Sequence, residues 1–309
     1  MTHFIVAFKT VLPLFLVIFT GALFSRTKVA SKDWVEILNQ YALYIGFPAL
    51  VIASLMNLEV NGNSYPTLIL VNSGYIIFCL LLAVPIARIF NLSLEMKRTL
   101  FLVLPFGNVA YLGIPVLSNA LGAEILPIAA IISAVYVFWL LTLAVILVEI
   151  YGKTRTEPKK LALSLAQNPL LLSVFIGLAI VWFQIELPDF LSKTINFFAD
   201  SVTAVVLFSL GIFLGMQKIG NISEWSRVFV YSILTMIVLP FLLYAIVILF
   251  NLEIPYLKAV IIDAAMPLGL TPYALSVQYK IKTSLVARVV VLATLLSMVV
   301  IPLWMVLLN

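Results

Sequence analysis

The sequence predicts an all-α membrane protein in which ten transmembrane helices form two inverted halves of five. The first observation is composition: 64% of the 309 residues are hydrophobic and 10% are charged, whereas soluble domains are about half apolar and about a quarter charged. The second is a series of ten apolar segments, each close to the ~20 residues that a helix needs to cross about 30 Å of hydrocarbon. The third is that the fourth and ninth segments carry helix-breaking residues in matching places.

Short polar connectors separate the apolar segments. We expect helices over residues 4–24, 34–56, 67–90, 98–122, 125–149, 167–184, 194–216, 228–250, 258–279 and 283–308. The first segment is longer than the hydrophobic part of a signal peptide and lacks a small-residue cleavage site, so we expect it to be retained. The longest connector divides the chain into a first repeat (1–150), a cytoplasmic linker (151–166) and a second, inverted repeat (167–309).

Basic residues are distributed unequally between the two sides of this arrangement. The connectors after odd-numbered segments, with their flanks, hold 15 of the 18 lysines and arginines, whereas the N-terminal side and the even connectors hold Lys9, Lys193 and Lys258. Basic residues accumulate in short cytoplasmic loops. We therefore expect a multi-pass protein of the cell (inner) membrane with the odd connectors inside and both termini extracytoplasmic.

Three sequence matches link the two halves. "PLFLVIFTG" (13–21) matches "PLLLSVFIG" (169–177), "IARIFNLS" (86–93) matches "IVILFNLE" (246–253), and "PFGNVAY" (105–111) matches "PLGLTPY" (267–273). Their offsets of 156, 160 and 162 rise in order, as loop insertions require. Because each half holds an odd number of segments, the second half would enter the membrane upside down.

The fourth and ninth segments, which contain the last of these matches, carry the helix-breaking residues. Pro105, Pro115, Pro267 and Pro272 each remove a backbone donor and crowd the preceding turn, while Gly107, Gly113 and Gly269 ease departure from the helix. Unpaired backbone in hydrocarbon costs several kcal/mol per group, so it must line a protein-enclosed cavity. Paired breaks in corresponding segments indicate a transporter site, and half-helix N-termini at such a site suit an anion. A single proline kink would indicate only packing.

Several classes of site are excluded by composition. The single cysteine, Cys79, lies in an apolar run, which argues against a disulfide framework or a cysteine metal site. The single histidine, His3, excludes a histidine cluster. We therefore expect no metal and no cofactor, and the net charge of +5 does not suggest nucleic acid.

The chain resembles the auxin efflux carrier family, a ten-span group that includes plant auxin exporters and bacterial malate and malonate permeases. The residues that carry the resemblance are "FGNVAYLGIPVLSNALG" (106–122), "NPLLLSVFIGLAI" (168–180), "MPLGLTPYALSVQYK" (266–280) and "LATLLSMVVIPL" (292–303). The resemblance implies a fold like that of sodium/proton antiporters and bile-acid symporters, with two broken, crossing helices in a mobile transport domain. Segments 1, 2, 6 and 7 would form a scaffold that often dimerises, and an elevator-type motion would carry an anion bound at the crossing.

Asn108 is the first candidate for substrate binding, because its amide can both donate to a carboxylate and accept a hydrogen bond. Its repeat mate is Leu270, so polarity in the second break would come from Thr271, Tyr273, Ser276 and Gln278 instead. The full set of candidate substrate-binding residues is Asn108, Gly107, Tyr111, Gly113, Thr271, Tyr273 and Ser276. Among ionisable residues within segments, which are costly and usually functional, we expect Asp263 and Asp200 to couple ions; Asp263 could equally make a structural hydrogen bond.

We therefore expect a secondary active transporter of small organic mono- or dicarboxylates, and not an enzyme. The partners would be the anion, the lipid bilayer and a second copy in a homodimer, with proton and sodium coupling both open. An anion channel and a membrane sensor derived from a transporter are the alternatives. An intramembrane enzyme with Asp200 and Asp263 as an aspartyl pair is a further alternative, and it requires adjacent carboxylates.

Overall fold

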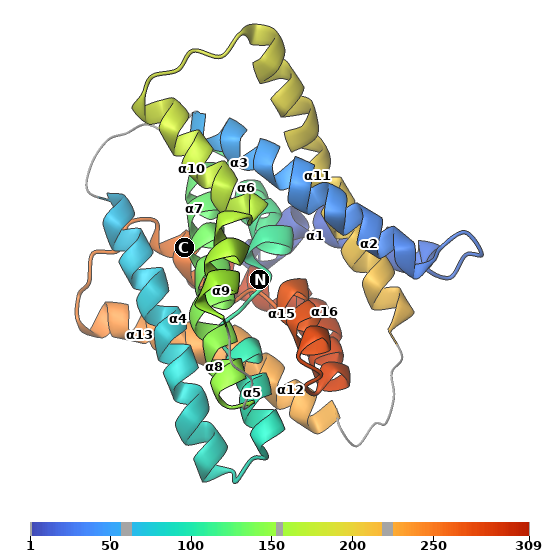
Figure 1. Ribbon diagram of the computed structural model, residues 1–309, viewed down its shortest axis with the longest axis vertical. Coiled ribbons are helices and arrows are strands. Elements are labelled where there is room, and N and C mark those ends of the chain that lie inside the picture. Colours follow the sequence, from blue (N-terminus) through green and yellow to red (C-terminus); the bar gives the residue numbers. More distant parts are fainter. Residues whose placement is uncertain (1, 57–63, 153–156, 218–224, 309) are drawn as a thin grey trace.

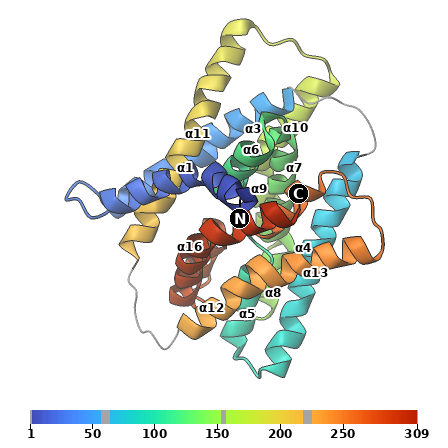
Figure 2. The same ribbon diagram turned by 180° about the vertical axis from the view of Figure 1, so that it is seen from behind.

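A computed structural model describes residues 2–56, 64–152, 157–217 and 225–308 of the chain, so Lys153, Arg155 and Lys218 of the expected basic connectors lie outside the described residues. Within these ranges the regular structure is helical (Figures 1 and 2). Seven helical stretches are long and apolar enough to cross a membrane: His3–Phe24, Lys32–Met56, Tyr65–Ile89, Ala123–Ile150, Asp189–Met216, Trp225–Leu249 and Thr283–Leu307. The remaining three expected segments are shorter or interrupted.

In the described ranges, the elements follow one another along the chain with four π-helical turns and one 3₁₀ turn between the α-helices. They are α1 (Thr2–Phe24), α2 (Lys32–Tyr41), η1 (Ala42–Gly46), α3 (Phe47–Met56), α4 (Ser64–Ile89), α5 (Leu94–Val103), η2 (Val109–Gly113), α6 (Ile114–Leu121), η3 (Ala123–Ile125), α7 (Leu126–Trp139), η4 (Leu140–Ala144), α8 (Val145–Ile150), α9 (Pro158–Ala166), α10 (Pro169–Trp182), α11 (Asp189–Met216), α12 (Trp225–Ile233), η6 (Leu234–Val238), α13 (Leu239–Leu249), α14 (Leu257–Ala264), α15 (Leu270–Gln278) and α16 (Thr283–Leu307).

The two segments with paired prolines are each split into two helices. The first runs as α5, an irregular stretch over 104–108, and then η2 and α6; the second runs as α14, an irregular stretch over 265–269, and then α15. Pro105 and Pro267 lie in the irregular stretches. Pro272 lies in the first turn of α15, where a missing N–H costs no intrahelical bond. Pro115 instead follows η2 without interruption inside the helical stretch Val109–Leu121, so its ring removes a donor from that helix.

Two further features differ from the expectation. The expected linker at 151–166 contains the helix α9, which begins at Pro158, a favourable first helical residue. The π-helical turns η1, η2, η4 and η6 lie inside long apolar segments. Such turns occur frequently at functional sites, and three of these four contribute residues to the cavity described below.

Glycines allow α1 and α11 to approach closely. A β-carbon on Gly21 would overlap the carbonyl oxygen of Phe208, and one on Gly211 would overlap that of Ile18. Gly215, four residues after Gly211, faces Ala22 and Ser25 in the same way. Small residues at such spacing let backbones of membrane helices pack without intervening side chains. With α2, α3 and α10, which pack on α11 or on one another, the pair forms one group of neighbouring helices.

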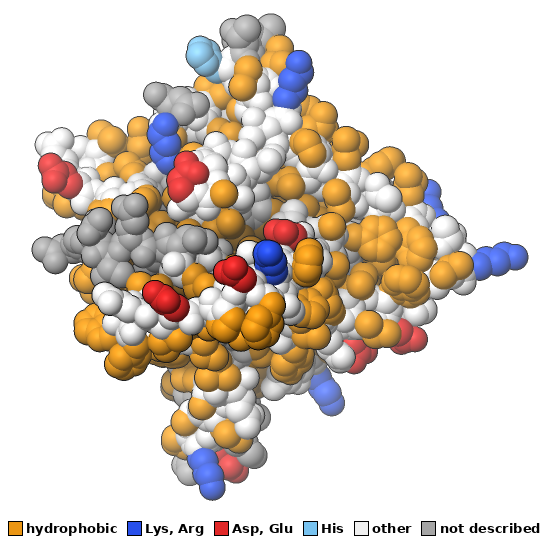
Figure 3. Space-filling model, turned by 90° about the horizontal axis from the view of Figure 1, so that it is seen from above, with side chains coloured by type: hydrophobic (Ala, Val, Ile, Leu, Met, Phe, Trp, Pro, Cys, Tyr) orange, Lys and Arg blue, Asp and Glu red, His pale blue; other side chains and the backbone are white. Residues whose placement is uncertain are grey.

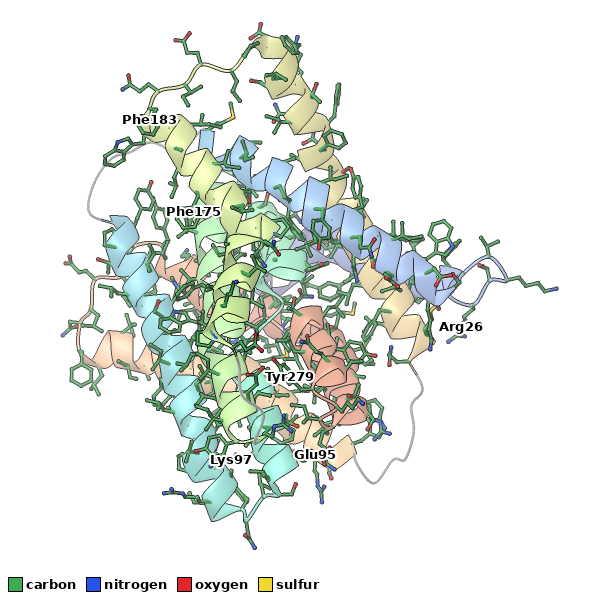
Figure 4. All side chains as sticks on the ribbon, viewed as in Figure 1. Arg26, Glu95, Lys97, Phe175, Phe183 and Tyr279 are labelled. Carbon is green, nitrogen blue, oxygen red and sulfur yellow. The ribbon has the colours of Figure 1, made fainter. Side chains whose placement is uncertain are left out.

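The surface is largely apolar. Large hydrophobic side chains such as Leu70, Leu81, Phe175 and Phe183 are exposed, and Phe175 and Phe183 project from α10 (Figure 4). Viewed from above, hydrophobic side chains cover much of the face and charged ones occur at a few separated points (Figure 3). A surface of this kind suits contact with lipid rather than water.

A polar cluster joins the ends of α5, α8, α15 and α16. The Lys282 Nζ lies 3.0 Å from Glu95 Oε2, and the Lys282 backbone N–H donates to Glu95 Oε1 at 3.0 Å. The Tyr279 hydroxyl donates to Glu149 Oε1 at 2.6 Å. Glu95, Lys97 and Tyr279 lie in the same region of the molecule in Figure 4. Hydrogen bonds and an ion pair thus connect residues far apart in sequence.

Candidate functional site

The two irregular stretches cross and are joined through their backbones. Gly107 and Leu268 form an antiparallel β-bridge. The Asn108 N–H donates to the Pro267 carbonyl at 2.6 Å, and the Gly269 N–H donates to the Phe106 carbonyl at 3.2 Å. Prolines and the loss of helix leave backbone groups unpaired, so each break supplies partners for the other.

Glycine at the crossing is required by space. A β-carbon on Gly107 would lie 2.9 Å from the Met266 carbonyl oxygen, and one on Gly269 would lie 3.2 Å from the Gly107 carbonyl oxygen. Both values are shorter than ordinary van der Waals contact. The two backbones can therefore approach within hydrogen-bonding distance only because these positions lack side chains.

Two helix N-termini begin at the crossing. Asn108 precedes η2 and Gly269 precedes α15, and neither residue caps its helix with a side-chain hydrogen bond. The first N–H groups of a helix have no intrahelical partner, and the helix dipole adds partial positive charge there. The crossing thus collects backbone donors and positive potential without a lysine or arginine.

A cavity of about 270 Å³ lies beside the crossing. This volume is close to the lower end of small-molecule sites, about 300 Å³. The lining comes from both breaks and from η1, α3, α7, η4 and α10: Leu43, Phe47, Phe106, Gly107, Asn108, Val109, Ala110, Tyr111, Tyr136, Val137, Leu140, Leu141, Asn168, Leu170, Gly269, Thr271 and Pro272. The cavity is mostly apolar, with a few polar groups that could orient a small ligand.

Three buried side chains around the crossing have polar atoms without a hydrogen-bond partner among the described residues. They are Nδ2 of Asn108, which is 3% exposed, the hydroxyl of Tyr136, which is 2% exposed, and both carboxyl oxygens of Asp263, which is 0% exposed. Buried polar groups in folded proteins are nearly always paired. These three groups can pair with a ligand, a proton or water in this region.

The structure brings some of the predicted substrate-binding residues together and separates others. Gly107, Asn108, Tyr111 and Thr271 line the cavity. The ring of Tyr111 also packs edge-on against Phe47, with 5.1 Å between centroids. These four residues come from both breaks, as the repeat predicted.

Gly113, Tyr273 and Ser276, which were also predicted to bind the substrate, do not line this cavity. The Tyr273 ring packs against Phe213, with 4.9 Å between centroids, and the Ser276 hydroxyl donates to the Tyr273 carbonyl at 2.7 Å. Gly113 lies against the carboxyl group of Asp263, where a β-carbon would overlap Oδ1. Helical geometry turns these residues away from the cavity, because they lie on other faces of η2 and α15.

The two aspartates occupy different surroundings. Asp263 is fully buried, with its carboxyl group against Gly113 of η2. Asp200 is exposed on α11 and lines a separate cavity of about 440 Å³ together with Glu124. An aspartyl pair requires adjacent carboxylates, so this arrangement speaks against an intramembrane aspartyl enzyme.

Two polar residues of the cavity, Asn168 and Tyr136, were not predicted from the sequence. Asn168 Oδ1 accepts hydrogen bonds from the N–H groups of Leu170 and Leu171, both at 3.1 Å, and so caps α10 at the cavity. The asparagine before Pro169 was a recognisable helix-start signal. Tyr136 lies in an apolar run with no local signal, and only the packing of α7 against η2 and α14 reveals its position.

Comparison with known proteins places the chain in a family. Residues 6–305 match the sequence model of a family described as "Membrane transport protein". The chain belongs to this family. The resemblance to auxin efflux carriers expected from the sequence is confirmed, because the chain also matches Auxin efflux carrier component 3a of Oryza sativa subsp. japonica. The two sequences are 26% identical over 149 residues, which cover 47% of this chain and 24% of the carrier.

Two relatives of this membrane transport protein match over most of their length. One, from Methanocaldococcus jannaschii, is named an uncharacterized transporter and is 25% identical over 285 residues, which cover 89% of this chain and 90% of the relative. The other, from Rhizobium meliloti, is provisionally named a malonate transporter and is 25% identical over 294 residues, or 93% of this chain and 91% of the relative. The protein is therefore a multi-pass membrane transporter and not an enzyme.

Proposed function

We propose that this membrane transport protein is a secondary active transporter of small organic anions, with the anion bound in the cavity at the crossing. The observation that carries the proposal is the convergence of two uncapped helix N-termini and the unpartnered Asn108 amide at one cavity. Hydrogen bonds from such donors to a carboxylate are charge-assisted and stronger than neutral ones.

The substrate class follows from the chemistry of the lining. The carboxylate of the substrate would accept hydrogen bonds from the Asn108 amide and from the N–H groups at the start of η2 and α15. Its carbon skeleton would contact Phe47, Leu140 and Leu170. A short mono- or dicarboxylate suits this combination and a volume of about 270 Å³. The name of the Rhizobium meliloti relative makes malonate the first anion to test.

We further propose an elevator-type alternating-access movement between two groups of helices. Leu43, Phe47, Asn168 and Leu170 of the cavity belong to α10 and to the η1–α3 stretch, which we assign to the scaffold with α1, α2 and α11. The remaining lining residues belong to the breaks and to α7 and η4, which we assign to the moving domain. A ligand site at the boundary of two packed groups is opened and closed when one slides past the other.

The topology and assembly are part of the same proposal. Ten spans in a 5+5 inverted repeat would place 15 of the 18 basic residues on the cytoplasmic side of the inner membrane and both termini outside. A homodimer would form through the scaffold. Of the two aspartates considered for ion coupling, we propose Asp263, because Asp200 is exposed at the other cavity.

The proposal is tested by uptake into proteoliposomes of a panel of radiolabelled mono- and dicarboxylates that includes malonate. We expect saturable uptake of at least one anion and a loss of about 10- to 100-fold in its affinity in Asn108→Ala, since a hydrogen bond to a charged group contributes about 1.5–3 kcal/mol. The matched control is Asn119→Ala, which removes an exposed amide that donates to the Thr10 carbonyl. Wild-type uptake that does not saturate would indicate a channel, and unchanged affinity in Asn108→Ala would remove Asn108 from the site.

A further inference from the structure

We propose that the carboxyl group of Asp263 carries a proton that is transported with the anion, and that the hydroxyl of Tyr136 connects this carboxyl group to the anion cavity. This inference rests on the proposed transport of anions and adds the coupling ion and the residue that transmits the coupling.

The surroundings of Asp263 favour a neutral carboxyl group. The side chain is 0% exposed, and neither oxygen has a hydrogen-bond partner among the described residues. Gly113 of η2 leaves the space that Oδ1 occupies. A buried charged carboxylate without protein partners is strongly unfavourable, so this conformation favours the protonated form of the group.

The titratable groups around Asp263 come from few elements. Tyr136 lies on α7, which packs against α14, and Tyr75 and Cys79 lie on α4, which packs against α7. The Tyr75 hydroxyl also donates to the Ala264 carbonyl at 3.5 Å. The buried residues that α6 and α13 contribute are apolar, and Arg288 of α16 is only partly buried, with interactions of its own.

Buried lysine or arginine is absent from the described part of the chain, and Glu149 is the other buried acid there. Glu149 accepts the hydroxyl of Tyr279, whereas Asp263 accepts nothing. A fixed positive charge therefore does not offset the carboxylate of Asp263. A proton is the smallest ligand that can neutralise it without additional oxygen atoms around it.

Tyr136 lines the cavity and lies on α7, which packs against α14, the helix of Asp263. Its hydroxyl lacks a hydrogen-bond partner among the described residues. A phenol has one proton to donate. In this conformation it donates to neither carboxyl oxygen of Asp263. A movement of the hydroxyl toward an ionised Asp263 would give it that acceptor, and an anion in the cavity would compete for the same proton. Protonation of Asp263 releases the hydroxyl for the anion, and a bound anion in turn favours the protonated carboxyl group.

This reciprocal effect makes the binding of proton and anion mutually favourable. On one side of the membrane a proton from water forms an O–H bond with a carboxyl oxygen of Asp263 as the anion binds. On the other side the same bond breaks, the proton returns to water, and the hydroxyl of Tyr136 turns to the carboxylate as the anion leaves. One proton would cross with each anion.

The first test uses [14C]malonate with reconstituted wild-type protein, Asp263→Asn, Tyr136→Phe and the control Tyr244→Phe, which alters a tyrosine that packs against Trp304 and does not line this cavity. We expect wild-type protein to accumulate malonate when an inward proton gradient is imposed. Asp263→Asn mimics the protonated group, so it should retain malonate exchange and lose gradient-driven accumulation. Tyr136→Phe removes a donor to the anion, so it should weaken both the affinity for malonate and the gradient dependence, while Tyr244→Phe should change neither.

The outcomes separate the inference from the function on which it rests. Malonate exchange by wild-type protein that ignores the proton gradient, or that follows a sodium gradient instead, would overturn the inference and leave anion transport standing. Equal gradient dependence in wild type and Asp263→Asn would also overturn it. Failure of wild-type protein to bind or move any anion of the panel would instead overturn the proposed function.

A second measurement needs no substrate. Infrared spectra of the purified protein at neutral pH should contain a carboxylic-acid C=O band that disappears in Asp263→Asn and persists in the control Glu149→Gln. Identical bands in wild type and Asp263→Asn would show that Asp263 is ionised at neutral pH, which would overturn the inference. Affinity for malonate should weaken about tenfold per pH unit once Asp263 ionises in wild type, as expected for one linked proton, and should not do so in Asp263→Asn.

Discussion

Gly113 and Asp263 share one space, because the carboxyl oxygen Oδ1 of Asp263 lies where a β-carbon of Gly113 would be placed. Gly113 is the last residue of η2, and Asp263 lies near the end of α14. The second broken segment therefore inserts its acidic side chain into a gap left by a glycine of the first. This contact fixes the relative position of the two breaks as directly as the backbone hydrogen bonds between them.

Replacing Gly113 with alanine should destabilise the protein. The added methyl group must displace the carboxyl group of Asp263 or separate η2 from α14, and overpacking of this kind costs about 1–3 kcal/mol. We expect a lower unfolding temperature in detergent and reduced anion uptake. The double variant Gly113→Ala/Asp263→Ala removes the obstructing carboxyl group, so it should regain stability without regaining proton-driven accumulation. Unaltered stability of Gly113→Ala alone would contradict the packing described here.

Replacing Gly211 with alanine should weaken the contact between α1 and α11. The β-carbon would overlap the Ile18 carbonyl oxygen, which is backbone and cannot move aside independently. We expect a loss of about 1–3 kcal/mol in stability, measured as a lower unfolding temperature. The matched control is Gly74→Ala on α4, where a β-carbon meets nothing within 4 Å. Since alanine is the better helix former by up to about 1 kcal/mol, Gly74→Ala should be neutral or stabilising. Equal effects on the unfolding temperature at both sites would contradict the close packing of α1 and α11 at Gly211.

Stability should depend on the protonation of Glu95 in the acidic range. Glu95 precedes the expected apolar segment 98–122, and the Lys282 backbone N–H, followed by the Lys282 ammonium, lowers the pKa of its carboxyl group below the ordinary value of 4.5. A lowered pKa in the folded state means that the stabilisation is complete above pH 4.5 and is lost as the pH falls through the lowered pKa.

Both side chains of this ion pair are about 40% exposed, so its contribution should stay below about 1 kcal/mol. The unfolding temperature measured between pH 3.5 and 7 should fall on the acidic side more steeply in wild type than in Glu95→Gln. Glu186→Gln, which removes an exposed acid of the connector between α10 and α11, serves as the control and should follow the wild-type curve. An identical acidic fall in Glu95→Gln would assign the loss to other groups.

The breaks could be predicted from the sequence because their cause is local. Proline and glycine determine where a helix stops, so Pro105, Gly107, Pro267 and Gly269 mark the crossing from either half alone. Asp263 was recognisable for a similar reason, as an acid within an apolar run. Burial then distinguishes it from Asp200, which has the same local signal and an exposed position.

The remainder of the site depends on contacts between distant segments. Tyr136 reaches the cavity only because α7 packs against η2 and α14. Tyr273 and Ser276 lie on the helix that carries Thr271 but face elsewhere, which a list of polar residues cannot distinguish. The π-helical turns change which residues face the cavity, and apolar stretches such as "LLTLA" (140–144) carry no local signal for them.

The hydrogen bonds at the crossing use main-chain atoms, and this has a consequence for how the protein can change over generations. The N–H of Asn108 donates to Pro267 whatever side chain residue 108 carries. Substitutions at Asn108, Thr271 or Tyr136 can thus alter which substrate the cavity binds while the backbone hydrogen bonds between the two broken segments persist. The same backbone crossing can therefore serve a substrate of another size or charge, provided that Gly107 and Gly269 remain glycine.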